Sequence, residues 1–537
     1  MITRRDMLKG TAAVAGSAIL PWTPEARLAS PAQGLPAGAG RGVGRSDLAL
    51  INGKFVDGRG EIATALTIKN GRITSVGSET KPDPDVLRVD LQGRTVIPGL
   101  FDSHAHYSRA GVNPGYEARR IERAFSISEL QEAIAARAKT VPAGAFVTCI
   151  GGWNHLQFAE ARRPTKAELD AAAPGHGVYI SGTGGDTGAI TNGRGQTLLA
   201  ARGVRVDDAT GRVAAPDEAL AALREVQTVD DRRRATAELN AHANALGLTA
   251  VKNSGNLDDL ELVLEIWRRG NLSVRMRPTF PAGSPAEVEA RVANNFSQQG
   301  RAVGDDMFRV VGFGERVGGM NTMSDAFEPT ARVVARHRWS LEQHSSTSAE
   351  NDFHLAAFQS IAKDHPVGDL RWALIHVNTI TAPVLKALMD LGVGVLPHGS
   401  ARYLGTAINA GPPFRRIVDS GVIAGAGTDA TNVAPLDPWL ALFYMTTGRN
   451  LAGQLTNDGQ QVSRVEALRM YTTGAAYYTF DDRELGSFEV GKYADLAVLS
   501  EDYLTVTDAR IRRIESVLTL VAGTVVHAAS PFAGLSR

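Results

Sequence analysis

Short apolar runs that end at a glycine, proline or polar side chain recur along the chain. Such runs are typical of buried strands, whereas apolar residues three and four positions apart are typical of helices. The segment 257–270 has the helical spacing, with Leu260 and Val263 among its apolar positions. Strands that alternate with such helices favour an α/β fold with a parallel sheet. We expect eight barrel strands. The first ends near His106, the second to fourth cover 248–255, 272–280 and 308–315, and the last four end near His344, His376, His398 and Asp429.

Two histidines one residue apart, His104 and His106, follow the apolar run TVIPGL in the segment GLFDSHAHYSRAG. Side chains at positions i and i+2 of a strand point to the same face, so two imidazoles at this spacing can bind one cation. Asp102 is placed to orient one of these rings. The pattern is short, and a pair of exposed or capped histidines near a strand end is the alternative interpretation.

Three further residues of metal-binding type follow apolar runs in the same way. His344 follows RWSLEQ, His376 ends RWALIH and Asp429 follows VIAGAGT. Each of them alone is more often a hydrogen-bonded structural residue than a ligand. Together with the histidine pair, they predict a metal site where the carboxyl ends of parallel strands meet, which is where a barrel builds its active site.

Composition and charge exclude some classes of partner. The 537 residues are 43% hydrophobic and 21% charged, so the chain can bury a large core. Lysine plus arginine equals aspartate plus glutamate at 57 each, and no net field favours nucleic acid or an anionic membrane. The single cysteine, Cys149, cannot form an internal disulfide and is expected to be a small buried hydrophobe.

The beginning of the chain has the order of basic, apolar and small residues that is typical of an export signal. Arg4 and Arg5 in MITRRDMLKG precede TAAVAGSAIL, which is too short and too weakly apolar for stable insertion in a membrane. We interpret residues 1–40 as a twin-arginine signal and linker, with a disordered basic tail as the alternative. The resemblance to such signals implies transport of the folded protein by the twin-arginine export machinery, to a periplasmic or secreted location.

Both flanks of the expected barrel carry ordered β-strand segments. DLALINGKFVDG, ALTIKNGRITSVG and VDLQGRTVIPGLFDSHAH precede it, and GSFEVGKYADLAVLS and VLTLVAGTVVH follow it. With the histidine motif, this order resembles the amidohydrolase superfamily of metal-dependent hydrolases, in its YtcJ-like branch, amidohydrolase family 3. The resemblance implies a (β/α)8 TIM-like barrel over 97–482 and a small β-sandwich domain built from 41–96 and 483–537.

A long insertion at 107–245 separates the first two barrel strands and is too long for an ordinary connection. Capping-box spacings at Ser128 and Thr165 predict helices within it. The resemblance implies that the insertion lies over the barrel mouth and helps to form the substrate pocket. His398, at the end of VGVLPH, is also expected to contact substrate, with core packing as its alternative. The candidate substrate-binding residues are Trp153, Asn154, Asp186, Asn192 and His398.

The chain departs from the family pattern on strand four. Many relatives carry there a carboxylated lysine that bridges two metals, and Val311 stands at the matching position. Glu315 could bridge instead, or it could orient a loop or pair with Arg316. Lys252 lies on a different strand and is interpreted as a pocket or core-edge lysine. After His344 the chain reads HSSTSAEN where relatives have a Gly-Asp pair, so the pocket wall has a different chemistry there.

The resulting hypothesis is that the protein is a hydrolase that uses a divalent metal ion, most simply zinc. It would bind one or two ions per chain, and we prefer the model with one ion. An ion held by His104, His106, His344 and Asp429 would make a water acidic, and Asp429 would shuttle its proton. His376 would be a ligand of a second ion or a donor to the carbonyl oxygen.

We expect a small-molecule substrate with a C–N bond: an amide, formamide or cyclic amide. Hydrolysis of an ester or lactone at the same site is one alternative, and a barrel that binds a small molecule without turnover is another. The sequence leaves open whether the protein forms a homo-oligomer.

Overall fold

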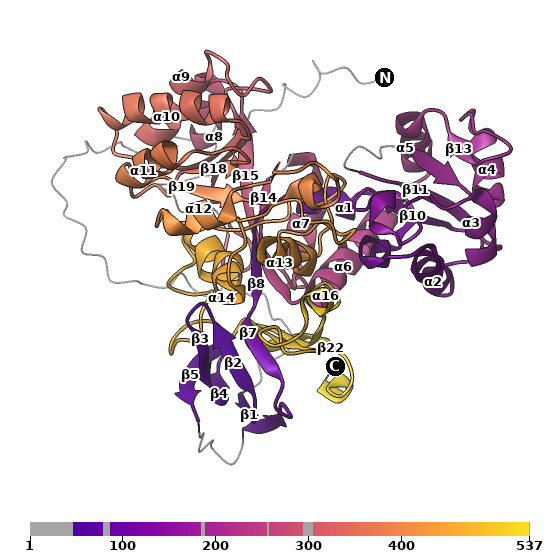
Figure 1. Cartoon of the computed structure of the whole chain (residues 1–537), viewed down its shortest axis with the longest axis horizontal. Coiled ribbons are helices and arrows are strands. Elements are labelled where there is room, and N and C mark those ends of the chain that lie inside the picture. The colour runs from indigo at the N-terminus through magenta and orange to yellow at the C-terminus, as the bar shows by residue number, and fades with distance from the viewer. Residues whose placement is uncertain are drawn as a thin grey trace, which may run out of the picture. The chain divides into compact units, whose positions relative to one another are not determined.

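The computed structural model describes residues 47–78, 86–183, 188–254, 257–293, 304–409 and 411–535, and its largest sheet is a parallel sheet of seven strands (Figure 1). Its order is β19-β18-β17-β16-β15-β14-β8, and every neighbouring pair is parallel. All carboxyl ends therefore lie at one edge. The strands are β8 (Leu100–Ala105), β14 (Leu248–Ser254), β15 (Arg275–Ala282), β16 (Gly312–Val317), β17 (Ser340–Ser345), β18 (Ala373–His376) and β19 (Gly394–Pro397).

The segment that leads to Asp429 nearly closes this sheet between β19 and β8. It forms backbone contacts to both strands but is not itself a regular strand. The predicted parallel barrel is confirmed in this form, with its eighth side made by an irregular segment. The contacts are a parallel bridge between Val395 and Ala424 and backbone hydrogen bonds from Ser103 N to Ala426 O at 3.1 Å and from Asp429 N to His104 O at 2.9 Å.

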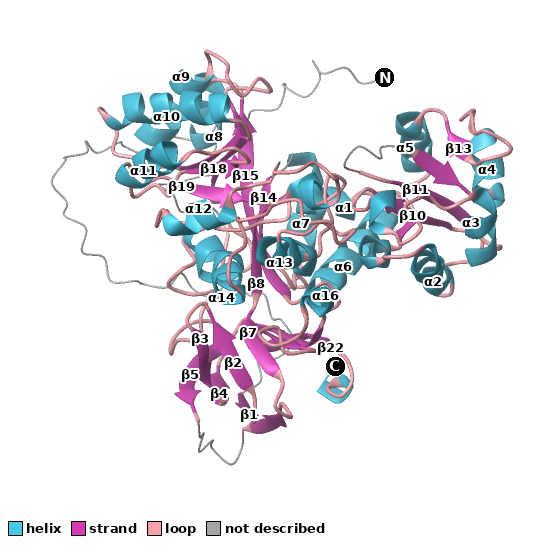
Figure 2. Ribbon diagram, in the orientation of Figure 1, coloured by secondary structure: helices cyan, strands magenta, loops and turns pink. Residues whose placement is uncertain are grey.

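Helices follow the barrel strands in alternation, as the apolar spacing predicts (Figure 2). In α9 (Phe327–Arg336) the buried residues include Phe327, Ala331 and Val334, which lie three and four positions apart on one face. Within the described ranges, no helix is long and apolar enough to cross a membrane. The other helices from α6 onward are α6 (Val229–Ala245), α7 (Leu257–Arg268), α8 (Pro285–Ala293), α10 (Ser348–Ala362), α11 (Ala382–Asp390), η4 (Ser400–Tyr403), α12 (Phe414–Asp419), α13 (Pro438–Thr447), α14 (Arg464–Arg469), η5 (Met470–Gly474), α15 (Ala475–Tyr477), α16 (Asp508–Ile511) and η6 (Ala533–Leu535).

Strands from before and after the barrel pair in one six-stranded sheet, of order β22-β21-β20-β7-β2-β3. Ile97 of β7 pairs with Ala497 of β20, so the two flanks meet directly. A four-stranded sheet, β5-β4-β1-β6, shares a hydrophobic cluster with it that includes Leu50, Phe55 and Leu518. A separate sandwich domain with the boundaries given above stays a prediction. The strands are β1 (Leu48–Ile51), β2 (Lys54–Asp57), β3 (Gly60–Ala63), β4 (Ala65–Lys69), β5 (Arg72–Gly77), β6 (Leu87–Asp90), β7 (Thr95–Pro98), β20 (Leu496–Leu499), β21 (Ser516–Val521) and β22 (Thr524–Ala528).

A buried ion pair joins the barrel to the segment that follows it. Arg275, at the start of β15, is 0% exposed and binds Asp495 through Nε–Oδ2 at 2.7 Å and Nη2–Oδ1 at 2.9 Å. Asp495 Oδ1 also accepts a hydrogen bond from Ala522 N at 2.8 Å. The carboxylate therefore connects a barrel strand and the segments around β20 and β21.

Replacing Asp495 with Asn should lower the free energy of unfolding by about 3 kcal/mol, because the buried Arg275 guanidinium loses its two-point ion pair and keeps only the contact of Nη1 with Asp306 Oδ2 at 3.2 Å. Urea denaturation measures the change. Glu501→Gln serves as the control, since its partner Arg510 is 58% exposed at the side chain and such pairs contribute little. Equal effects of the two substitutions would contradict the importance of the buried pair.

The insertion between β8 and β14 contains a sheet of its own, of order β13-β12-β11-β10-β9. The sequence predicts only its helices. The capping box at Thr165 is confirmed, but the predicted cap at Ser128 is wrong, because Ser126 accepts the hydrogen bond from Glu129 N. The elements are α1 (Tyr107–Gly111), β9 (Tyr116–Glu117), η2 (Arg119–Arg123), α2 (Ile127–Ala138), β10 (Phe146–Ile150), η3 (His155–Gln157), α3 (Lys166–Ala172), β11 (Gly177–Ser181), β12 (Ala189–Thr191), α4 (Gly193–Ala200), β13 (Arg212–Val213) and α5 (Pro216–Glu225).

Candidate metal centre

Side chains that can bind a metal gather at the carboxyl ends of the barrel strands. Each candidate lies in the last part of a strand, directly after it, or in the segment that closes the sheet, and their ligand atoms form overlapping groups within 4.8 Å. The structure therefore brings together all the predicted metal-type residues, and with them His398, which the sequence predicts as a substrate contact. The residues are His104 on β8, His106 after it, Glu315 on β16, His344 on β17, His376 on β18, His398 after β19, and Asp429.

The first group consists of His104, His106, Glu315 and Asp429. The Nε2 atom of His104 lies 3.0 Å from Glu315 Oε2 and 3.6 Å from Asp429 Oδ1. The Nε2 atom of His106 lies 3.3 Å and 3.4 Å from the same two oxygens. Two imidazoles and two carboxylates thus direct their ligand atoms toward one point.

Glu315 also belongs to a second group, with His344 and His376. Its Oε1 atom lies 3.4 Å from His344 Nδ1, which is 2.8 Å from His376 Nε2. A third group combines His376 with His398 and Asp429. His344 therefore lies with Glu315 and His376 rather than in the group of His104 and Asp429 where the sequence places it.

The charges of the first group call for a cation between its members. Burial lowers the pKa of His104, but Asp429 and Glu315 outweigh it and hold the pKa well above its ordinary value. For His106 the same balance raises the pKa to about 9. Burial raises the pKa values of Glu315 and Asp429, but the facing imidazoles hold both well below their usual range. A divalent ion would supply the positive charge that protons on the imidazoles otherwise supply.

Several of these ligand atoms are buried without a hydrogen-bond partner in the part of the chain that the structure describes. They are both ring nitrogens of His104, both ring nitrogens of His398, and Glu315 Oε2. Buried polar atoms are nearly always satisfied, so a cluster of open ones indicates an absent ligand. Imidazole and carboxylate donors suit a divalent ion such as zinc. The residues present therefore fit a metal.

The model of the Amidohydrolase family matches residues 88–527. The chain belongs to this family. N-substituted formamide deformylase of Arthrobacter pascens is 24% identical over 89% of this chain and 98% of its own. Putative amidohydrolase YtcJ of Bacillus subtilis (strain 168) is 21% identical over 87% and 96%. The solved atrazine chlorohydrolase TrzN of Arthrobacter aurescens TC1, complexed with zinc, has a TM-score of 0.55 at 16% identity, over 90% of this chain and 95% of that one.

The comparisons confirm the family that the sequence predicts and identify this amidohydrolase as a hydrolase. The relatives match over nearly their whole length, so the likeness is not confined to the histidine motif. The TrzN likeness supports the barrel fold.

Hydrogen bonds that involve the backbone hold two of the candidate ligands of the amidohydrolase, His104 and His106, in place. His106 Nδ1 donates to Ser254 O at 2.7 Å, so in the neutral imidazole the single proton stays on Nδ1 and the Nε2 atom can bind an ion. The prediction for Asp102 is wrong, because its carboxylate binds backbone and a hydroxyl rather than a ligand ring. It accepts hydrogen bonds from His104 N at 3.1 Å and from Thr428 N at 3.0 Å and Oγ1 at 2.5 Å. Asp102 thus ties β8 to the segment that carries Asp429.

Sequence reasoning missed Glu342, which pairs with Lys252. Both are 0% exposed, and Lys252 Nζ lies 2.8 Å from Glu342 Oε2. Burial raises the pKa of Glu342, but Lys252 and His104 lower it to about 2. Of the two interpretations given for Lys252, a pocket or a core-edge lysine, its full burial agrees with a place in the core. The sequence did contain a signal that could have identified Glu342 as a site residue. It lies two positions before His344 on the same strand, so the two side chains point to the same face.

Glu315 contacts the metal-type histidines and also Arg316, the two kinds of partner that the sequence suggests for it. Arg316 Nε lies 3.3 Å from Glu315 Oε1, so the pairing expected from the sequence occurs beside the metal-type contacts. Val311, where relatives carry the bridging lysine, is 1% exposed. In the changed segment after His344, Ser346 Oγ lies 3.3 Å from His344 Nε2.

The predicted substrate contacts in the insertion are mostly packed inside it. Trp153 is 1% exposed and stacks on Phe158. Asn154 caps η3, and Asn192 caps α4 by accepting from Gly195 N at 2.9 Å. Asp186 lies outside the described residues. Contact of these residues and of His398 with substrate stays a prediction.

The insertion does contact the loop that follows Asp429. Thr183 Oγ1 donates to Val433 O at 3.1 Å, and Leu436 N donates to Glu122 Oε2 at 2.9 Å. Through this loop the insertion is linked to the segment that carries one of the candidate ligands.

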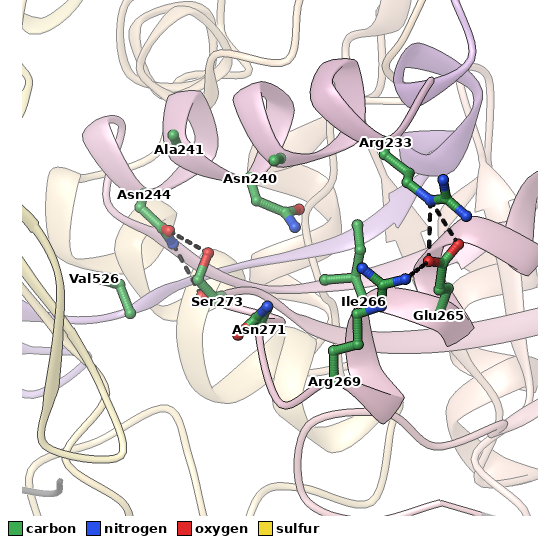
Figure 3. A pocket seen from close by; sticks show the side chains of 11 residues that line it. Arg233, Asn240, Ala241, Asn244, Glu265, Ile266, Arg269, Asn271, Ser273 and Val526 are labelled. Carbon is green, nitrogen blue, oxygen red and sulfur yellow. Dashed lines mark hydrogen bonds and ion pairs between the residues drawn. The ribbon is translucent and has the colours of Figure 1, made fainter. Parts of the chain in front are cut away.

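A cavity of about 220 Å³ is lined by residues of α6, of α7 and of the segment that follows α7, with Val526 (Figure 3). Arg233 Nε donates to both oxygens of Glu265 at 3.0 Å, and Arg269 pairs with the same carboxylate. None of the metal-type residues lines this cavity, so it is not the metal centre.

Proposed function

We propose that this amidohydrolase uses a divalent ion, zinc, to hydrolyse a C–N bond in a small amide, formamide or cyclic amide. The observation that carries the proposal is the cluster of buried metal-type side chains, in which both ring nitrogens of His104 and the Oε2 atom of Glu315 have no hydrogen-bond partner among the described residues. The relative named N-substituted formamide deformylase supports the choice of bond.

His104, His106, Glu315 and Asp429 would hold the ion. When bound, it would polarise the substrate carbonyl and make a water more acidic. Asp429 would accept a proton from the attacking water and deliver it to the leaving nitrogen as the C–N bond breaks. His376 and His398 would donate hydrogen bonds to the carbonyl oxygen as negative charge builds on it. Burial lowers the pKa of His376 well below its ordinary value and that of His398 to about 3, so both are neutral imidazoles.

We expect about one zinc per chain in protein purified without added metal, because the first group offers four ligands. Elemental analysis measures the ratio. Two stoichiometric ions would instead support Glu315 as a bridge to His344 and His376, and the absence of any ion would remove the basis of the proposal.

A panel of formamides, amides and cyclic amides with matched esters and lactones tests the reaction. Metal-replete protein should release amine from a C–N substrate, a chelator should abolish turnover, and zinc should restore it. Turnover of esters or lactones alone would favour an ester or lactone hydrolase that uses the same site. Tight binding without turnover of any compound would favour a non-catalytic barrel.

We also propose export through the twin-arginine route, from Arg4 and Arg5, which lie outside the described residues. Replacing both with lysine should retain the folded protein in the cytoplasm, as cell fractionation would show. Unchanged delivery of this variant would refute the proposal. A periplasmic or secreted location depends on the same test.

A further inference from the structure

A lysine and a glutamate form a fully buried ion pair in the interior of the barrel. Lys252 on β14 and Glu342 on β17 are both 0% exposed, and Nζ lies 2.8 Å from Oε2. The second carboxylate oxygen accepts a hydrogen bond from Thr279 Oγ1 at 2.5 Å. β14 and β17 are not neighbours in the sheet, so the pair crosses the barrel interior.

The paired oxygen of Glu342 also faces the first candidate ligand. Glu342 Oε2 lies 3.6 Å from His104 Nδ1, a distance longer than a hydrogen bond. The Nδ1 atom of His104 is buried and has no hydrogen-bond partner within the described residues. The opposite ring nitrogen, Nε2, faces Glu315 and Asp429. His104 therefore stands between a carboxylate on its Nδ1 side and the donor group on its Nε2 side.

The backbone of β16 leaves room for this arrangement. A Cβ atom at Gly314 would lie 2.2 Å from Glu342 Cγ, so a side chain there would displace the glutamate. The position of Glu342 beside His104 therefore depends on a residue without a side chain on the neighbouring strand.

We propose that Glu342 and Lys252 are positioning residues that keep the proton of His104 on Nδ1, so that Nε2 presents its lone pair to the ion. A neutral imidazole carries one proton, and a carboxylate beside one nitrogen favours the proton on that side. Lys252 supplies the countercharge that an ionised carboxylate needs in a buried place. The inference rests on the proposed function in one respect, that His104 binds an ion.

A merely structural role predicts a different response to removal of the pair. Loss of one partner alone leaves an unpaired buried charge and can unfold the protein whatever the role of the pair. Loss of both charges together avoids this, because side chains of similar size can fill the space. Lys252→Met with Glu342→Gln is therefore the variant that separates positioning from folding.

The double variant should fold, with a circular dichroism spectrum like that of the parent. Its zinc dissociation constant should rise about 10- to 100-fold, as is typical when a metal-binding histidine loses the residue that hydrogen-bonds its other ring nitrogen. Competition with a chromophoric chelator measures the constant. Arg275→Met with Asp495→Asn is the matched control, because it removes another buried pair that contacts none of the candidate ligands. This control should keep the zinc affinity of the parent.

The absorption spectrum of the Co²⁺-loaded protein gives a second readout that does not depend on turnover. Its visible bands should change in the Lys252→Met, Glu342→Gln variant and not in the control. A folded variant with parental zinc affinity and parental Co²⁺ bands would overturn the inference. If the parent itself binds neither ion, the proposed function fails instead.

Discussion

His104→Ala protein should be purified without its ion and without hydrolase activity. The substitution removes one of four candidate ligands, and its Nε2 atom is the one that approaches Glu315 most closely, at 3.0 Å. Zinc content should fall from about one ion to well below a tenth of an ion per chain, since a lost ligand removes the binding free energy of the site. Elemental analysis and an amide hydrolysis assay measure the two losses together.

His354→Gln is the control for this experiment. His354 is also a buried histidine, but its ring nitrogens contact Ser345 Oγ at 3.0 Å and Thr322 O at 2.9 Å, and it belongs to none of the three donor groups. This variant should keep its zinc, even if it unfolds at a lower temperature. A His104→Ala protein that kept parental zinc would exclude this histidine as a ligand.

Asp429→Asn should lower turnover by about 10²- to 10⁴-fold, as expected for loss of a general base. The amide keeps the size of the side chain and can still contact an ion, but it cannot accept a proton. Substrate binding and zinc content should change much less. Steady-state kinetics with a hydrolysed amide, together with elemental analysis, separate these effects.

Near-normal turnover of the asparagine variant would show that Asp429 does not shuttle the proton, and His376 would become the leading candidate. Loss of zinc together with turnover would indicate instead that Asp429 acts mainly as a ligand. Both results would leave the family assignment unchanged.

The barrel and its donor cluster could be predicted because their signals are local. His104 and His106 share a strand face by spacing alone, and His344 and His376 each end an apolar run. Parallel strands then bring these ends together without any knowledge of the pairing.

The remaining features depend on contacts between distant segments. The partner of Lys252 is set by the order of strands in the sheet, and no spacing in the sequence connects it to Glu342. The sheet of the insertion was missed because strands as short as β9 and β13, with two residues each, have no periodicity to detect. The close approach of Gly427 to β8 likewise has no signal in the sequence, although a Cβ atom there would lie 2.7 Å from His104 N.

The pairing of Ile97 with Ala497 has a consequence for synthesis of the chain. β7 emerges from the ribosome long before β20, and until then one of its edges offers unpaired backbone groups to any other strand. Contacts between such distant segments also make folding slow. The newly made protein must therefore pass through a period in which its first sheet is incomplete and open to aggregation, a period in which a chaperone that covers the edge of β7 would protect it.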